Sequence, residues 1–472
     1  MIPASLLIIL ILLVGAVLAY FLRRWRSVEV LIAAICCGLG ILILSRPIDA
    51  PAAIGGININ LQMPVNLFGR VLAVRSTEQM PLLLFFIVAL VLFLLGLAVS
   101  QGWTFVPLGM IILAMLSTGL MIRPFVYAAL AFEAAAAVAA IMIQAERSGQ
   151  NSTRGAFRYL IISTLALPAF LGAGYVIAQA AGINDPVAQV AAYGPAAVLL
   201  GIGFVLMIGA LPIFTWTFSV VADAPPLTAA LLATIGVGAV AFLFVSLKQD
   251  YAWFTANTDV RSLCNLFGLA TILIGCVLGW TQTSFGRVIA CGLSVEIGST
   301  LLLLNQNNAY SVEVIAFGIA ARALSLGVLG VGISILRERA GSDDFTQIGG
   351  LGRKLLWPVL AIAVGGLSLA GLPGTVGFVS RWTAARVLGQ TDLEVLVLTL
   401  VAGASVGAGF IRGLFALFSH ALADDKPLPD RHGRRQAITI AVGVVLVVLM
   451  GIVPGVAAPV TRTIAENYTY LK

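Results

Sequence analysis

Long apolar runs recur along the whole chain and dominate its hydropathy pattern. Residues 6–22, 82–99, 105–122 and 438–453 are each apolar almost throughout. A helix needs about 20 such residues to cross the hydrocarbon of a bilayer. The runs lack the alternation of apolar and polar residues that is typical of membrane-barrel strands. Helices are the other structure that satisfies the backbone polar groups in lipid. The pattern therefore predicts an all-α polytopic membrane protein.

The apolar runs divide the chain into about fourteen transmembrane helices. We expect them near 2–22, 28–45, 80–100, 104–122, 124–145, 158–179, 190–217, 226–247, 262–280, 286–304, 312–336, 354–379, 394–418 and 436–458. The longest polar-tolerant insert is 46–80. Gly55 and Gly56, followed by the alternating stretch 57–63, predict a small hairpin or an interfacial segment there.

Proline interrupts two of these helices, the seventh and the twelfth, at matching places. Pro212 follows Ala-Leu in the seventh, and Pro373 lies inside Ala-Gly-Leu-Pro-Gly in the twelfth. Proline removes a helical hydrogen bond, and paired broken helices five elements apart are typical of repeats around a transport path. We therefore expect two inverted five-helix repeats, helices 4–8 and 9–13. The alternative is that both prolines are ordinary kinks.

The expected repeats organise the rest of the chain. Helices 1–3 occupy 1–100, the first repeat 101–250, the second repeat 251–420, and a C-terminal helix lies in 421–472. The first apolar run begins at Ile2, with no basic region before it and no small-residue cleavage site, so we interpret it as a retained helix.

Composition excludes a soluble protein and gives the chain an orientation. Of 472 residues, 60% are hydrophobic and only 10% are charged, against roughly 25% charged in soluble proteins. The net charge of +7 does not indicate a nucleic-acid partner, because the basic residues cluster in the loops after helices 1, 5, 11 and 13. Those loops should face the cytoplasm. We therefore expect an integral protein of the bacterial inner membrane. Both of its termini are expected on the side of the membrane away from the cytoplasm.

No metal or cofactor site is expected within this chain. The five cysteines lie inside predicted helices without a CxxC pair or a Cys/His cluster, which argues against iron–sulfur and zinc sites. Two histidines, both at or near a loop, are too few for a haem-bearing membrane protein. The cysteines are Cys36, Cys37, Cys264, Cys276 and Cys291.

Charged residues inside predicted helices are the candidate functional groups. Glu133 lies in the middle of helix 5, and Glu296 lies in helix 10, its counterpart in the second repeat. A carboxylate in a membrane is costly unless it is paired, protonated or hydrated, which makes both glutamates candidates for proton transfer. Arg322 and Arg381 supply cations, but arginine does not release its proton. The alternatives are structural ion pairs and, for Arg381 and Arg412, arginines that reach the membrane surface.

Three stretches of the chain match the sequence patterns of one known family. They are Leu211–Trp216 with Ala224-Pro225-Pro226 and Leu231–Thr234, then Gly286–Ala290, then Leu367–Pro373 with Gly377, Phe378 and Arg381. The corresponding family patterns are VPFHxW with GAPxPV and LAT, KRLLAYSSI, and LSLAGIPxxxGFxxK. In these stretches the chain resembles the antiporter-like membrane subunits of respiratory complex I and related complexes, closest to the N-type subunit, and the similarity extends over helices 4 to 14.

The resemblance implies a membrane-arm subunit of an NADH:quinone oxidoreductase-type proton pump. NADH, quinone and iron–sulfur clusters would belong to partner subunits, and the partners in the bilayer would be other membrane-arm subunits. The resemblance identifies Glu133 with the family's helix 5 glutamate and places Arg381 where its helix 12 lysine belongs. The lysine positions of helices 7 and 8 are Met207 and Val237, so the usual lysine relay is largely absent.

Several functions therefore remain open. Within the family, Glu133 and Glu296 could still conduct protons, with Arg322 and Arg381 setting their charge, or the subunit could be a scaffold that no longer pumps. A hydrogenase-like complex, an Mrp-type cation/proton antiporter and a stand-alone transporter are the alternatives. A stand-alone transporter should line its broken helices with several polar side chains, and few are present.

Overall fold

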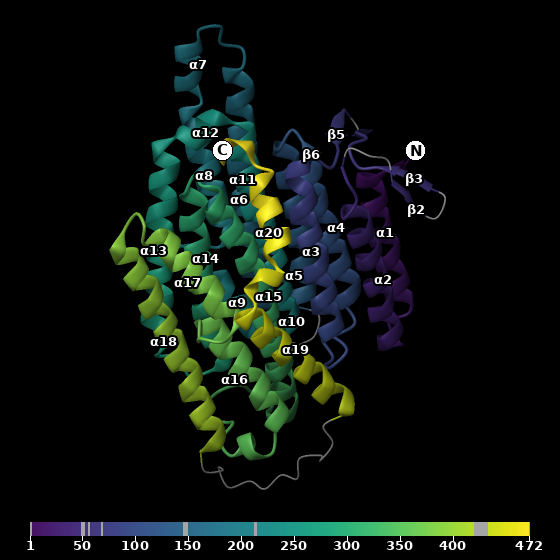
Figure 1. Cartoon of the computed structure of the whole chain (residues 1–472), viewed down its shortest axis with the longest axis vertical. Helices are drawn as coiled ribbons and strands as arrows, with labels where there is room; N and C mark the ends of the chain where they lie inside the picture. Colours follow the sequence, from purple (N-terminus) through teal and green to yellow (C-terminus); the bar gives the residue numbers. More distant parts are fainter. Residues whose placement is uncertain are drawn as a thin grey trace.

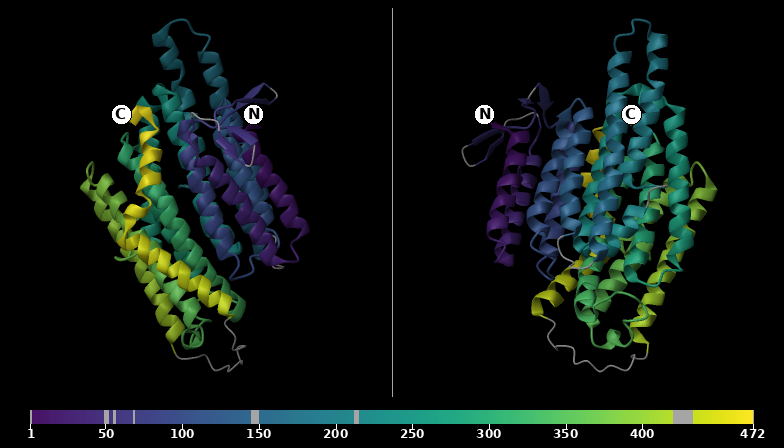
Figure 2. Two further views of the ribbon diagram at one scale, coloured as in Figure 1. Left: turned by 45° about the vertical axis from the view of Figure 1, so that its right-hand side comes forward. Right: turned by 180° about the vertical axis from the view of Figure 1, so that it is seen from behind.

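The chain folds into an elongated helical bundle, shown in Figure 1 as a computed structural model. The structure describes residues 2–48, 52–54, 57–67, 69–144, 150–211, 215–419 and 433–471. Both ends of the chain lie at the same end of the bundle, beneath a projecting helical hairpin. The N-terminal helices lie along one side, and the last helices, drawn in yellow, run obliquely across one face of the bundle (Figure 2).

The predicted all-α membrane fold is confirmed. In the described residues, twelve helices are long and apolar enough to span a membrane, and two shorter apolar helices, Phe105–Met121 and Leu356–Ala370, bring the total to 12 + 2 = 14. The helices of the N-terminal part and first repeat are α1 (Ala4–Phe21), α2 (Arg26–Leu44), α3 (Ser76–Leu95), α4 (Phe105–Met121), α5 (Val126–Gln144), α6 (Gln150–Ala180), α7 (Pro186–Ala192), α8 (Gly194–Ile208), α9 (Thr215–Asp223), α10 (Pro226–Leu231), the π-helix η1 (Leu232–Gly236) and α11 (Val237–Asp250).

The second part of the chain has the same plan, with one long central helix. Its helices are α12 (Ala252–Ala256), α13 (Thr258–Gly279), α14 (Phe285–Asn305), α15 (Ala309–Ala340), η2 (Leu351–Arg353), α16 (Leu356–Ala370), α17 (Val376–Leu388), α18 (Leu393–Phe418), α19 (Arg434–Ile452), η3 (Pro454–Val456), α20 (Ala458–Glu466) and η4 (Thr469–Leu471). The α10–α11 segment, α14 and α15 are almost entirely buried. Helix α14 carries Glu296 and α15 carries Arg322, while Glu133 lies on α5 and Arg381 on α17.

Both predicted helix breaks are present. Helix α8 ends at Ile208 and α9 begins at Thr215, while α16 ends at Ala370 and α17 begins at Val376. Pro212 itself lies outside the described residues. Helix α8 starts at the end of the bundle that carries the termini, whereas α16 starts at the opposite end (Figure 1). The two broken helices therefore run in opposite directions, as inverted repeats require.

Each break begins with the same helix ending. Gly209 after α8 and Gly371 after α16 both have left-handed backbone conformations, with φ of 83° and 85°. In both, the following amide donates to a carbonyl five residues earlier, which is the Schellman ending that favours glycine. The glycine-terminated helix end, together with the proline, explains why the chain leaves the helix at these points.

Several predicted helix ends need correction. Helix α3 begins at Ser76 rather than 80, α6 begins at Gln150 rather than 158, and α17 extends to Leu388 rather than 379. Apolar runs locate the part of a helix in lipid and miss polar first turns, such as the one where the side chain of Glu78 bonds the Arg75 amide. The π-helix η1 also interrupts a helix that the pattern predicted as continuous.

The insert between α2 and α3 contains more strands than the predicted hairpin. Strands β2 (Ala52–Ile54) and β3 (Ile57–Asn60) form that hairpin, and β1 (Ile2–Pro3) pairs alongside β3. A second small sheet contains β4 (Val65–Leu67), β5 (Arg70–Leu72) and β6 (Ile122–Arg123). Gly55 and Gly56 lie outside the described residues. Pairing with distant residues is invisible to a local pattern, so β1 and β6 were not predicted.

Candidate functional site

Three of the predicted residues form one buried cluster, the Glu296 cluster, made of Glu296, Arg322 and Arg381. Glu296 on α14 accepts a hydrogen bond from Nη2 of Arg381 on α17, with 3.1 Å between Nη2 and Oε1. Nη2 of Arg322 on α15 lies 3.7 Å from the other carboxylate oxygen. The side chains of the two arginines are only 2% and 4% exposed, and that of Glu296 is 15% exposed. The cluster is thus an ion pair of one carboxylate with two guanidinium groups inside the bundle.

Arg381 also closes the broken end of α16. Its Nη2 donates to the carbonyl of Leu369 at 2.7 Å, in the last turn of α16. The last carbonyls of a helix lack helical partners and carry partial negative charge, so a cation there is stabilising. The break therefore creates the acceptor that holds Arg381, and Pro373 lines the same groove as Arg381.

Glycine at 371 is required for this arrangement. A Cβ atom at this position would lie 2.8 Å from Cδ of Arg381, and the backbone φ of 85° is one that other residues rarely adopt. Gly374 has a similar φ of 87°, but a Cβ atom there would meet nothing within 4 Å. The two glycines thus share the backbone requirement and differ in what lies beside them.

We expect Gly371→Ala to destabilise the protein more than Gly374→Ala. Each variant should lose about 1–2 kcal/mol from the left-handed backbone, and only Gly371→Ala should also displace Arg381 from Glu296. Denaturant titration of both purified variants in mixed detergent micelles measures the difference. Equal losses would show that Gly371 serves the backbone alone.

Arg322 connects this cluster to the first half of the chain. Its Nη1 donates to the carbonyl of Ala233 at 3.1 Å, and its Nη2 donates to Oγ1 of Thr300 at 3.1 Å. Ala233 belongs to the π-helix η1. Single π-turns inside α-helices occur frequently at functional sites, and here the widened turn is held by an arginine of the second repeat.

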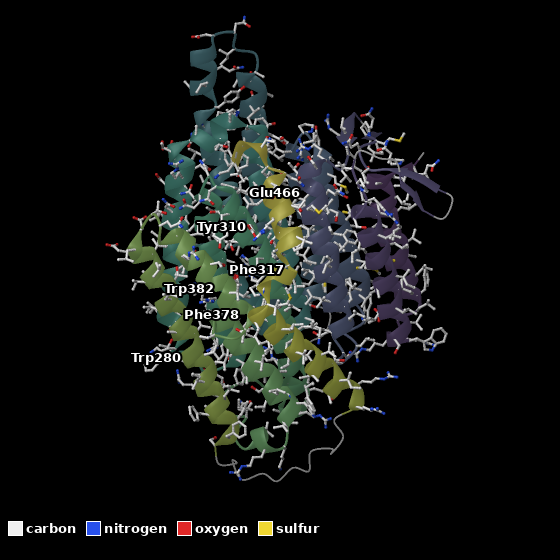
Figure 3. The ribbon with its side chains drawn as sticks, in the orientation of Figure 1. Trp280, Tyr310, Phe317, Phe378, Trp382 and Glu466 are labelled. Carbon is white, nitrogen blue, oxygen red and sulfur yellow. The ribbon has the colours of Figure 1, made fainter. Side chains whose placement is uncertain are left out.

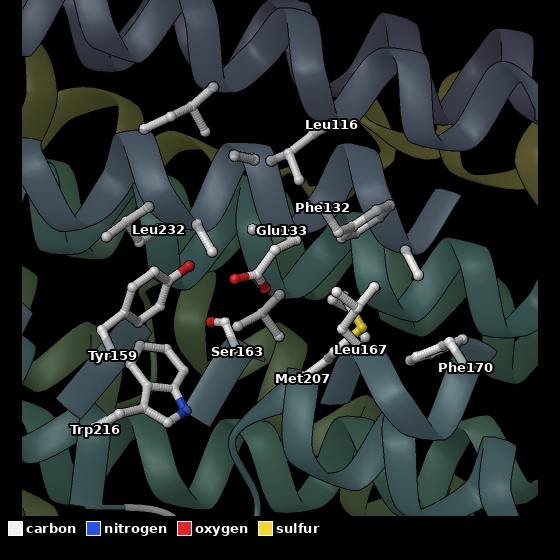
Figure 4. A pocket seen from close by; sticks show the side chains of 17 residues that line it. Leu116, Phe132, Glu133, Tyr159, Ser163, Leu167, Phe170, Met207, Trp216 and Leu232 are labelled. Carbon is white, nitrogen blue, oxygen red and sulfur yellow. The ribbon is translucent and has the colours of Figure 1, made fainter. Parts of the chain in front are cut away.

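Glu133 lies in a separate cavity of about 40 Å³, the Glu133 cavity. Its carboxylate points into the cavity, with the side chains of Ser163 and Tyr159 facing it (Figure 4). Thr164 donates a hydrogen bond to Oε1 of Glu133 at 2.5 Å. A volume of about 10–15 Å³ in this measure holds one water molecule, so the cavity has room for water beside the carboxylate.

The two expected lysine positions line this same cavity. Met207 of α8 and Val237 of α11 both contribute to its wall, and Met207 is visible next to Leu167 in Figure 4. No ion pair to Glu133 is present among the residues that the structure describes. In the first repeat, Glu133 therefore faces a cavity whose wall is apolar at the two positions where lysines were expected.

The structure thus brings together Glu296, Arg322 and Arg381 and leaves Glu133 apart from them. Among the ion pairs of the described residues, both arginines pair with Glu296 and neither pairs with Glu133, so their expected influence on Glu133 stays a prediction. The π-helix η1 is the element between the two sites, because Leu232 and Gly236 line the Glu133 cavity while the carbonyl of Ala233 faces Arg322. Periodicity gave no signal for this link.

Two further charged groups lie outside both sites. The guanidinium of Arg412 contacts the carbonyl of Trp280 at an exposed position. The sequence did not single out Lys248 on α11, whose buried ammonium donates to the carbonyl of Leu304 at 2.6 Å and to Asn307 at 2.9 Å. Lys248 could have been recognised from the sequence, because it is a lysine in the last turn of a mostly apolar helix. Among the described residues, no group of three or more His, Cys, Asp or Glu side chains is arranged to hold a metal ion.

The sequence matches a known family over most of the two repeats. The pattern of the NADH:quinone oxidoreductase/Mrp antiporter transmembrane family matches residues 125–407. The chain is 30% identical over 308 residues to NADH-quinone oxidoreductase subunit N of Rhodococcus opacus, covering 63% of this chain and 54% of that protein. It is 28% identical over 359 residues to subunit N 1 of Solidesulfovibrio magneticus, covering 73% and 74%. The chain thus spans about half the length of the first relative and three quarters of the second.

Solved structures share the fold over nearly the entire chain. A chain of the archaeal membrane-bound sulfane sulfur reductase superposes with a TM-score of 0.79 at 16% identity, covering 98% of this chain and 97% of that one. A chain of respiratory complex I from Thermus thermophilus superposes with a TM-score of 0.72 at 21% identity, covering 96% of this chain and 98% of that one. A chain of the Mrp complex from Dietzia gives 0.79 at 16% identity, with 98% and 52% covered.

Proposed function

The chain belongs to the NADH:quinone oxidoreductase/Mrp antiporter family, and we propose that it is an antiporter-like membrane-arm subunit of a complex I-type, redox-driven proton pump. The relatives named subunit N of NADH-quinone oxidoreductase support this assignment. The observation that carries it is the Glu296 cluster, in which a buried carboxylate meets two arginines at the break of α16. Residues 101–250 and 251–420 would be the two functional repeats.

Protons would be held by the two glutamates. Glu133 and Glu296 are the carboxyl groups that can bind and release a proton inside the membrane, whereas Arg322 and Arg381 remain charged and cannot. In the first repeat, the hydroxyl groups of Thr164, Ser163 and Tyr159 surround Glu133, so a proton could pass along hydroxyls and water. In the second repeat, the carboxylate of Glu296 contacts the guanidinium groups of both Arg322 and Arg381.

The two repeats would communicate through η1. A change of charge on Glu296 alters its attraction for Arg322, and Arg322 holds the π-turn that lines the Glu133 cavity. An arrangement of the turn that opens or closes the cavity would then depend on the state of the second site. This link would replace part of the lysine relay whose positions are occupied by Met207 and Val237.

Partners and orientation follow from the same proposal. NADH, quinone and iron–sulfur clusters would be bound by partner subunits, and this chain would contact other membrane-arm subunits in the bacterial inner membrane. Arginines gather at the end of the bundle opposite the termini, at the α1–α2 turn, the start of α6, the end of α15 and the start of α19 (Figure 1). The preference of cytoplasmic loops for positive charge supports both termini outside the cytoplasm.

We expect Glu133→Gln to lower proton translocation by about tenfold or more, as expected for loss of a proton-transferring group, while the complex still assembles. The amide fits the same space and can still accept from Thr164. Proton uptake into membrane vesicles during electron transfer measures the effect. The matched control is Glu466→Gln, which changes an exposed glutamate at the end of α20. Unchanged translocation in Glu133→Gln would remove Glu133 from the relay.

A non-pumping scaffold is the second candidate, favoured by the apolar replacements at Met207 and Val237. In that case neither Glu133→Gln nor Glu296→Gln would affect translocation in complexes that assemble. Mass spectrometry of what co-purifies in mild detergent tests the assignment to a redox complex. Redox subunits among the partners would support it, and small membrane subunits alone would indicate an Mrp-type antiporter instead.

A further inference from the structure

An apolar groove, the α18 groove, opens beside the break between α16 and α17. It has a volume of about 340 Å³ and lies between these two helices and α18. Its rim carries Phe378 and Trp382, whose rings stack at 6.2 Å and 9° and which lie on α17 at the side of the bundle (Figure 3). Trp382 is 45% exposed, so the groove is accessible from the side of the bundle.

The groove lies near the middle of the membrane. Helix α16 has 15 residues before the break and α17 has 13 after it. At 1.5 Å per residue, the break is about 20 Å from either end of this broken helix. The hydrocarbon core of a bilayer is about 30 Å thick, so phospholipid headgroups at its surface do not reach the groove.

A buried cation with unused donors forms the inner wall of the groove. Nη2 of Arg381 is engaged by Glu296 and Leu369, but Nη1 and Nε have no hydrogen-bond partner in the described part of the chain. The side chain is 4% exposed. Buried donors are normally satisfied, and a charged one that is not satisfied carries a large desolvation cost. The unused N–H groups of Arg381 therefore indicate an acceptor in the groove.

The charge of the Glu296 cluster indicates that this acceptor is an anion. Two guanidinium groups and one ionised carboxylate leave a net charge of 2 − 1 = +1 inside the bundle. The lack of a side chain at Gly403 of α18 leaves room beside Nη1 of Arg381, because a Cβ atom at this position would lie 2.9 Å from Nη1. Beyond Gly403, the wall formed by α18 consists of small and apolar residues (Ala404, Gly407, Ala408 and Ile411).

We propose that the α18 groove binds a long-chain carboxylate, a fatty-acid type of ligand, with its carboxylate on Nη1 of Arg381 and its alkyl chain along α18. The carboxylate would supply the acceptor and the negative charge that the cluster lacks. The alkyl chain of the ligand would cover the apolar wall of the groove and the ring of Trp382. Binding at this position depends on Arg381 and on the shape of the groove, and it does not require that the subunit pumps protons.

Quenching of tryptophan by a brominated ligand tests the proposal. The purified full chain is placed in nanodiscs of phosphatidylcholine and titrated with 9,10-dibromostearate, and in parallel with its methyl ester. Both probes enter the bilayer with the same alkyl chain, and only the first has a carboxylate. We expect a saturable quenching component with the carboxylate alone, and its loss in Trp382→Phe.

Three variants separate charge, shape and folding. Arg381→Gln should weaken binding by about ten- to a hundredfold, as expected for loss of a charge-assisted hydrogen bond. Ala404→Leu should block the groove while Arg381 is retained, which keeps the test valid if Arg381→Gln folds poorly. Arg412→Gln, an exposed arginine change on the same helix α18, should bind as the unaltered protein does. Equal quenching by acid and ester, or no effect of Ala404→Leu, would overturn the proposal.

Discussion

Replacing Glu296 by glutamine is expected to lower the free energy of unfolding by about 3–5 kcal/mol, because it removes one partner of a buried ion pair. Both guanidinium groups would stay buried, and the charge of the cluster would rise by one unit. Glutamine keeps the size of the side chain, so packing changes do not contribute. Denaturant titration of the purified protein in mixed detergent micelles measures the loss.

Two further variants show whether uncompensated charge causes that loss. The double variant Glu296→Gln/Arg322→Gln returns the cluster to its original net charge, so it should recover part of the lost stability. Glu133→Gln changes a glutamate without an ion pair among the described residues, and it should lose less than about 1 kcal/mol. Equal losses in Glu296→Gln and Glu133→Gln would contradict the role of the two arginines.

The sequence predicted what depends on single segments. Each apolar run is long enough to require a span, whatever lies beside it, so the number of helices and both breaks were predictable. Glu133, Glu296, Arg322 and Arg381 could be singled out because each charge interrupts an apolar run. The length needed to cross the hydrocarbon and the cost of burying a charge there determine these features within each segment. They do not depend on which helices lie beside it.

The sequence could not predict which charges meet. Glu133 and Glu296 occupy equivalent helices of the two repeats, and nothing local shows that only Glu296 has arginine partners. The angle of each helix about its axis decides this, and it depends on packing with distant segments. The contact of Arg322 with the carbonyl of Ala233 was also not predictable. It requires a π-turn in a segment whose apolar pattern predicts an ordinary α-helix.

Arg322 is the residue whose alteration should most affect coupling between the two repeats. Its guanidinium reaches Glu296, Thr300 and the carbonyl of Ala233 at once. Lysine carries the same charge but is a compact donor group that cannot span three separate acceptors. If only the charge mattered, Arg322→Lys would be harmless. If the link to η1 matters, Arg322→Lys should lose nearly as much proton translocation as Arg322→Met does.

We expect the second result, with the number of protons translocated per electron transferred falling by about tenfold in both variants, as for loss of a group needed for proton transfer. Electron transfer and proton uptake, recorded together in vesicles that contain the assembled complex, separate lost coupling from lost assembly. Arg337→Lys is the matched control, since Arg337 lies on the same helix α15 and pairs with Asp343 at 2.8 Å outside both sites. Full translocation by Arg322→Lys would show that its charge alone suffices, and the π-turn would then have no part in connecting the glutamates.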